Sequence, residues 1–307
     1  MLSRIAESLF WIGRYLERAD GTSRILDVYL QLLLEDPWME ESEACGSLLT
    51  ILGNPHQSGT VITRQNVIDM LAVDAEQPGS IAFSLRAARE NARRAREIVS
   101  AELWECLNTT AALLPKSVSP SKVHDFFNWT RHRTALAVGI NESAMNRDEA
   151  WYFFTLGHCL ERADMTARLL ATRSLAEAGG ASWTTILRAC GAYEAYLRAH
   201  RGTPARDHAA EFLLINRLFP RSIMFSVAKA LDCVRALDGA EESSSYQARM
   251  ALGQVISNLE YTPVEQLISD LPENMEKVQI ATNSTSVAIA QKYFPSQVLP
   301  TWTGDKS

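Results

Sequence analysis

The strings YLERAD (15–20) and CLERAD (159–164) share five consecutive residues and lie 144 positions apart. The match extends on both sides, because residues 9–28 and 153–172 agree at ten of twenty aligned positions. Two more pairs recur at nearly the same offset, PGSIAFS (78–84) with PRSIMFS (220–226), and LLTILG (48–53) with ILRACG (186–191). Repetition of this kind predicts two copies of one structural unit.

The copies are predicted to consist of helices. Residues 3–34 carry an apolar seam at heptad spacing: Leu9, Ile12, Leu16, Ala19, Ser23, Leu26, Leu30 and Leu33. Capping and breaking residues predict further helices over 80–112, 120–145 and 149–177, and shorter ones over 44–53, 64–73, 183–200, 205–216 and 222–238. No stretch has the alternation that a strand requires.

We therefore predict an all-α fold, an internally duplicated antiparallel helical bundle with two repeats of about 145 residues. The repeats would span about 1–146 and about 147–295, with a short C-terminal tail over 296–307. Because only a short turn separates the helices that join the copies, we expect one domain over 1–307 with a shared core.

Composition restricts the function classes. A formal charge of −6 and a pI near 5.6 argue against nucleic acid or an anionic membrane as partner. The five cysteines are scattered and form no Cys-x-x-Cys pair, which favours buried free thiols in a reducing compartment. The N-terminal segment is interrupted by charges, so it matches neither a signal peptide nor a membrane span. We expect a cytoplasmic protein.

Charged residues of the repeated helix gather along one flank of its apolar seam. At 100° per residue this flank holds Glu17, Asp20 and Arg24 in the first copy and Glu161, Asp164 and Arg168 in the second. Arg18 and Arg162 point elsewhere on the same projection. Two interpretations stay open: a buried ion network where the copies meet, with Gly13 and Gly157 allowing close helix approach, or a polar pocket for a ligand.

A metal site is not expected on this flank. Di-iron bundles use Glu-x-x-His, whereas no histidine follows Glu17 or Glu161 by three residues, and arginines would repel a divalent cation. The chain also has no glycine-rich phosphate loop, no Gly-x-Ser-x-Gly elbow and no local Cys/His signature. We assign no catalytic residue and no cofactor.

A second charged feature belongs to one copy only. Within residues 80–112, a row of arginines falls within about 80° opposite an apolar face, and its members are Arg86, Arg89, Arg93 and Arg96. In the second copy only Arg235 is kept, opposite Arg93. The row is either a solvated, ion-paired face or a contact surface for acidic groups.

Several stretches together resemble the alpha-E family, a group of bacterial helical proteins with a recurring Glu-Arg motif. They are LSRIAESLFWIGRYLERAD, SLRAARENARRAREIVSAELWE, LGHCLERADMTARLL, GAYEAYLRAHRG and AEFLLINRLFPRSIMFS. The resemblance runs from Leu2 to about Phe294. One segment departs from it, because GNPHQSGTVITRQN in the first copy is less typical than GAYEAYLRAHRG in the second.

The resemblance implies a working context. Genes of this family neighbour those of circularly permuted ATP-grasp proteins and transglutaminase-like cysteine proteases, and alpha-E regions are found fused to ATP-grasp proteins. We therefore expect a non-catalytic helical partner, or substrate-presenting subunit, of an amide-bond-forming system. The alternatives are a ligand-binding or catalytic component that uses the polar flank, and a helical oligomerisation scaffold. The sequence does not indicate an oligomeric state.

Overall fold

All regular elements among residues 1–35, 40–54, 61–171, 182–200, 202, 204–238 and 245–295, which the computed structural model describes, are helices. This confirms the all-α class, while the predicted tail 296–307 lies outside the described residues. The first part of the chain forms α1 (Ser3–Glu35), α2 (Glu41–Ile51), α3 (Arg64–Ile68), a π-helical turn (Asp69–Val73), α4 (Ile81–Arg94), α5 (Ala101–Ala112), a 3₁₀ turn (Pro120–Lys122) and α6 (Val123–Ala144). The second part forms α7 (Glu149–Ala171), α8 (Trp183–Ala189), α9 (Tyr193–Ala199), α10 (Arg206–Ile215), α11 (Ile223–Asp238), α12 (Tyr246–Tyr261), α13 (Val264–Ser269) and α14 (Leu271–Tyr293).

Two predicted helices are each divided in two. The segment 80–112 forms α4 and α5, because the first ends at Arg94 and a new N-cap follows, where the Ser100 hydroxyl accepts from the Leu103 amide. The segment 183–200 forms α8 and α9, which are separated by Gly191 at φ 61°, a left-handed conformation that ends a helix. The seam of α1 is as predicted, with Leu9, Ile12, Leu16 and Leu26 almost fully buried.

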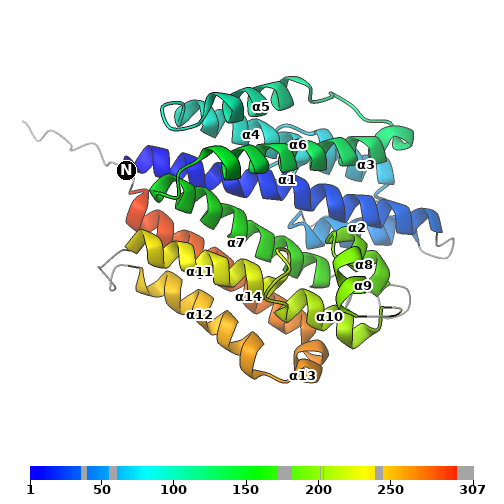
Figure 1. Cartoon of the computed structure of the whole chain (residues 1–307). Coiled ribbons are helices and arrows are strands. Elements are labelled where there is room, and N and C mark those ends of the chain that lie inside the picture. The colour runs from blue at the N-terminus through cyan, green and yellow to red at the C-terminus, as the bar shows by residue number, and fades with distance from the viewer. Residues whose placement is uncertain are drawn as a thin grey trace, which may run out of the picture.

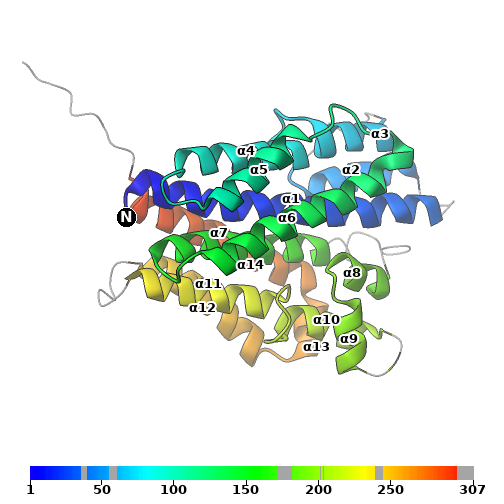
Figure 2. The same cartoon turned by 45° about the horizontal axis from the view of Figure 1, so that its top comes forward.

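Among the described helices, α1 and α7 make the most extensive contact; they lie at the centre and run in parallel (Figures 1 and 2). The N-terminal ammonium of Met1 lies 2.9 Å from Glu149, and further along Arg162 Nη2 lies 2.8 Å from Glu17 Oε2. This direction differs from the antiparallel packing expected throughout. The parallel direction arises because α6 runs antiparallel to α1, with Arg131 bonded to Asp27. The chain therefore returns to the N-terminal end of α1 before α7 begins.

Close approach of these two helices depends on one glycine in each. A Cβ atom on Gly13 would lie 2.2 Å from the carbonyl oxygen of Phe154, and one on Gly157 would lie 2.1 Å from that of Phe10. The backbones are therefore in direct contact at both positions. Gly13 and Gly157 are aligned with each other in the segments 9–28 and 153–172, and so are Phe10 and Phe154. The glycine of each helix thus contacts the phenylalanine of the other helix.

The other helices surround this pair in two groups. Helices α4 and α6 pack on α1, whereas α11 and α14 pack on α7, and a single cluster of buried apolar residues runs through both groups. In Figure 1, α4 and α6 lie above α1, and α11 and most of α14 lie below α7. All five cysteines are buried free thiols, as predicted. Among the described helices, none combines the length and the apolar character needed to cross a membrane.

Substitution of alanine for Gly13 or Gly157 should force α1 and α7 apart. We expect each change to lower the free energy of unfolding by about 1–3 kcal/mol or more, because backbone oxygens cannot move aside. Gly139 and Gly253 are matched helical controls, since nothing lies within 4 Å of a Cβ there. Alanine at those sites should be neutral or stabilise by up to about 1 kcal/mol. Equal effects in urea unfolding at all four sites would contradict the close contact.

Candidate functional site

The first carboxylate cluster lies where α1 meets the second group of helices. Glu17 Oε2 lies 2.8 Å from Arg162 Nη2 and 2.8 Å from His158 Nε2, and Glu17 Oε1 accepts from Arg221 Nη1. Arg221 Nη2 donates to Asp20 Oδ2 at 2.6 Å, and Arg24 Nε donates to the same oxygen at 2.7 Å. Arg221 therefore bridges the two carboxylates through both arms of its guanidinium.

The second cluster is built from the aligned residues of α7. Glu161 Oε2 accepts from Arg14 Nε at 2.6 Å, and both oxygens accept from Arg18, at 2.5 Å from Nε and 3.1 Å from Nη2. Asp164 Oδ2 accepts from Arg168 Nε at 2.7 Å. The arginine of each repeated string thus pairs with the glutamate of the other string.

Arg24 and Arg168, which lie four residues after Asp20 and Asp164, each also donate to a backbone carbonyl in the other part of the chain. Arg24 Nη1 donates to the carbonyl of Ala189 at 3.3 Å, and Arg168 Nη1 donates to that of Ile51 at 2.8 Å. These carbonyls belong to the aligned segments ILRACG and LLTILG, and each lies at the end of a helix, where carbonyls lack a helical partner. The charged flank therefore joins the two parts of the chain by ion pairs and by contacts to helix C-termini.

Burial and ion pairing set the protonation of these groups. Burial opposes ionisation of Glu161, but Arg14 and Arg18 outweigh it and lower the pKa of its carboxyl to about 2. Burial is likewise overcome at Glu17, where Arg162 and Arg221 hold the pKa well below its usual range. At Asp164 burial prevails over Arg168, with a further contribution from Glu161, so the pKa of this carboxyl is raised.

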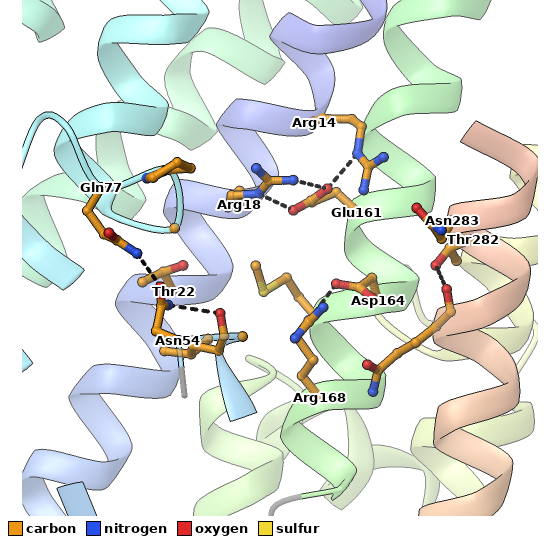
Figure 3. A pocket seen from close by; sticks show the side chains of 16 residues that line it. Arg14, Arg18, Thr22, Asn54, Gln77, Glu161, Asp164, Arg168, Thr282 and Asn283 are labelled. Atoms are coloured by element: carbon orange, nitrogen blue, oxygen red, sulfur yellow. Dashed lines mark hydrogen bonds and ion pairs between the residues drawn. The ribbon is translucent and has the colours of Figure 1, made fainter. Parts of the chain in front are cut away.

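A pocket opens beside the second cluster. Its volume is about 460 Å³, and Figure 3 shows Glu161 and Asp164 on α7 facing it with the arginines that bind them. The far walls are polar: Gln77 donates to Asn54 Oδ1 on one side, and α14 supplies the other side. The lining residues with polar side chains are Arg14, Arg18, Thr22, Asn54, Gln77, Glu161, Asp164, Arg168, Gln279, Thr282 and Asn283.

The predicted flank residues thus divide between two environments. Glu161, Asp164 and Arg168 line the pocket, whereas Glu17, Asp20 and Arg24 do not and form the closed cluster with Arg221. Both interpretations left open by the sequence are therefore represented in the geometry, an ion network on one side of the α1–α7 pair and a polar pocket on the other.

The expectation that Arg18 and Arg162 point away from this flank is wrong. A helical projection gives the direction of Cβ, while the long arginine side chain extends around the helix to the partner glutamate. Arg14, His158 and Arg221 were also missed. Arg14 and His158 occupy aligned positions in the segments 9–28 and 153–172, a signal that could have identified them, but Arg221 comes from a distant segment.

The arginine row does not approach the repeated carboxylates. Arg86 and Arg93 are exposed on α4, and Arg89 stacks over Trp104, with its guanidinium carbon 5.4 Å from the ring centroid. Arg96 lies beyond the end of α4, so the row is not one continuous helix face. Arg93 Nη2 lies 2.6 Å from Glu90 Oε1, as in an ordinary surface pair.

Substitution of glutamine for Glu161 should remove an acid-sensitive contribution to stability. Because the folded pKa of Glu161 is about 2, against an ordinary 4.5, this contribution is complete above pH 4.5 and is lost as the pH falls toward 2. We expect E161Q to lower the free energy of unfolding at pH 7 by about 3 kcal/mol, and by less at pH 3. Urea titrations at the two pH values measure both numbers.

The matched control is E90Q, which alters an exposed Glu–Arg cluster. It should change the free energy of unfolding by less than about 1 kcal/mol, because surface pairs are screened by water. A loss in E161Q that is no larger than that in E90Q would contradict the buried network.

Comparison with known proteins places the chain in a family. A family model described as a predicted alpha-helical domain with a conserved ER motif, Alpha-E, matches residues 1–294. Similar curated relatives are uncharacterised proteins of Mycobacterium bovis and of two strains of Mycobacterium tuberculosis, each 27% identical over 269 residues. The match covers 78% of this chain and 30% of each relative, so the chain spans less than a third of their length. No solved structure matches. By the extent of the family match, the chain belongs to the Alpha-E family.

Proposed function

We propose that the protein is a non-catalytic binding component that holds a small polar ligand in the pocket beside Glu161 and presents it to an amide-bond-forming enzyme. The observation that carries this proposal is the pocket itself, about 460 Å³ with two buried carboxylates and three arginines on its wall. A volume of this size suits a small ligand, and convergent polar groups fix the orientation of what binds.

The state of Glu161 supports binding rather than proton transfer. A general acid or base works best with a pKa near the working pH, whereas Arg14 and Arg18 hold the pKa of Glu161 at about 2. This carboxylate stays ionised near neutral pH, and its bonds to both arginines fix its position. It is therefore suited to hold the guanidinium groups of Arg14 and Arg18 in place on the pocket wall.

Asp164 favours a second candidate function, a catalytic role in the pocket. Its carboxyl is buried and its pKa is raised, which brings it closer to the range in which a side chain exchanges protons. Asparagine at this position separates the two candidates. A catalytic Asp164 predicts loss of turnover with intact ligand binding, whereas a binding Asp164 predicts loss of both.

We also propose that the chain is an internal duplication with repeats over about 1–146 and 147–295. Support comes from the repeated strings, from the reciprocal glutamate–arginine pairs of α1 and α7, and from the similar surroundings of the two helices. The length of the mycobacterial relatives supports a module that works beside other domains. We further propose that the protein is cytoplasmic and that its partners are an ATP-grasp ligase and a transglutaminase-like protein.

Co-expression with an ATP-grasp protein encoded beside the gene of this chain tests the proposal. We expect one complex by size exclusion at micromolar concentration and a loss of ligase turnover when the pocket is blocked. Asn283→Trp is a suitable block, because this exposed residue lies on the pocket rim. Ser284→Trp is the matched control, since it is exposed on the same helix and does not line the pocket.

The arginine row supplies an independent variant for the docking step. Combined glutamate substitutions at Arg86, Arg93 and Arg96 should weaken the complex without altering the pocket, because these residues are exposed on or beside α4. Two separate peaks together with unchanged ligase activity would refute the partner role. Equal turnover with Asn283→Trp and Ser284→Trp would refute the presentation of a ligand from the pocket.

A further inference from the structure

The pocket has a counterpart across the α1–α7 pair that is filled by a side chain of the protein. There Arg221 bridges Glu17 and Asp20. The aligned strings PRSIMFS and PGSIAFS place Gly79 at the position of Arg221, and Gly79 lines the pocket. The carboxylates aligned with Glu17 and Asp20 thus face a cavity at the place where a guanidinium lies in the other half.

Thr22 also differs from its aligned residue. It is fully buried, it lines the pocket, and its Oγ1 has no hydrogen-bond partner within the described part of the chain. The aligned Thr166 donates to the backbone oxygen of Arg221 at 3.1 Å. A buried hydroxyl without a partner costs free energy, which a ligand group in the pocket would recover.

Asp164 has fewer donors than its aligned residue. Asp20 Oδ2 accepts from both Arg24 and Arg221, whereas Asp164 Oδ2 accepts from Arg168 alone among the described residues. Asp164 is 8% exposed and faces the pocket (Figure 3). Arg14 supplies a third arginine to this half, but it bonds to Glu161 and to Ser286, not to Asp164.

We propose that the pocket binds a zwitterionic ligand of basic amino-acid type, whose guanidinium or primary ammonium head takes the place that Arg221 takes in the other half. Asp164 accepts from the cationic head. The carboxylate of the ligand faces the arginines, because Arg14, Arg18 and Arg168 against Glu161 and Asp164 leave one net positive charge on the wall. This inference rests on the proposed function and names its ligand class.

Thermal-shift and calorimetric titrations with L-arginine, L-lysine and agmatine test the head group. L-citrulline is the matched control, since it keeps the shape of arginine and lacks the charge. We expect L-arginine or L-lysine to raise the melting temperature by roughly 2 °C or more, and citrulline to leave it unchanged. Agmatine, which lacks the carboxylate, should bind more weakly than L-arginine.

Gly79→Arg tests the position of the head group with the protein's own side chain. The tightest contact of the new Cβ would be with the flexible end of Asn54, at 3.2 Å, while Leu52 O and Leu71 Cδ2 would lie at 3.9 and 4.0 Å. Gly79 is not among the glycines with positive φ. We expect G79R to raise the melting temperature of the unliganded protein and to weaken L-arginine binding at least tenfold. Gly139→Arg adds the same residue on α6, where nothing lies within 4 Å, and should bind L-arginine as the wild type does.

The outcomes separate this inference from the proposed function. Binding of L-arginine that is equal in wild type, G79R and G139R would overturn the inference, as would equal binding of citrulline and arginine. If acetate or phosphate binds in the pocket and no basic amino acid does, the inference is wrong, but the proposal that the protein presents a ligand is not contradicted. If no probe binds and Asn283→Trp leaves ligase turnover unchanged, both the inferred ligand class and the proposed ligand-presenting function are wrong.

Discussion

The exchange of glutamate–arginine pairs between α1 and α7 is the interaction on which the rest of the structure depends. Gly13 and Gly157 bring the two backbones into contact, and this contact buries Glu17 and Glu161 almost completely. A carboxylate at that depth is tolerated only with charged partners, which the opposite helix supplies through Arg162 and Arg18. The glycines at the contact and the charged residues one turn later therefore depend on each other: the close contact buries the glutamates, and the buried glutamates require arginines from the opposite helix.

The same arrangement is completed differently on its two sides. Around Glu17 a third arginine, Arg221, closes the cluster with a side chain from the loop before α11. Around Glu161 the third arginine is Arg14, which approaches from α1 and leaves the side of Asp164 open to the pocket. The Glu17 side is thus a closed ion network, whereas on the Glu161 side the carboxylate of Asp164 faces a pocket that a small molecule can enter.

The helices and the charged flank could be predicted from the sequence, because both follow from residue spacing along a single element. The break between α4 and α5 could not, since no glycine or proline lies between Arg94 and Ser100 and only the serine cap marks it. The parallel direction of α1 and α7 depends on the return of α6. The bridging role of Arg221 depends on tertiary packing of a segment 201 residues from Asp20, which no local pattern encodes.

The sequence distance between these partners has a consequence for folding. Glu17 finds its arginines at positions 162 and 221, and Glu161 finds its own at 14 and 18, so neither buried carboxylate is neutralised by nearby residues of its own half. Each half, folded alone, would carry an unpaired charge on an exposed apolar face. Formation of the α1–α7 contact must close a loop of more than a hundred residues, which is slow and makes folding of the halves interdependent. The chain should consequently fold and unfold as one cooperative unit, and the glycine contact can form only after α7 has left the ribosome.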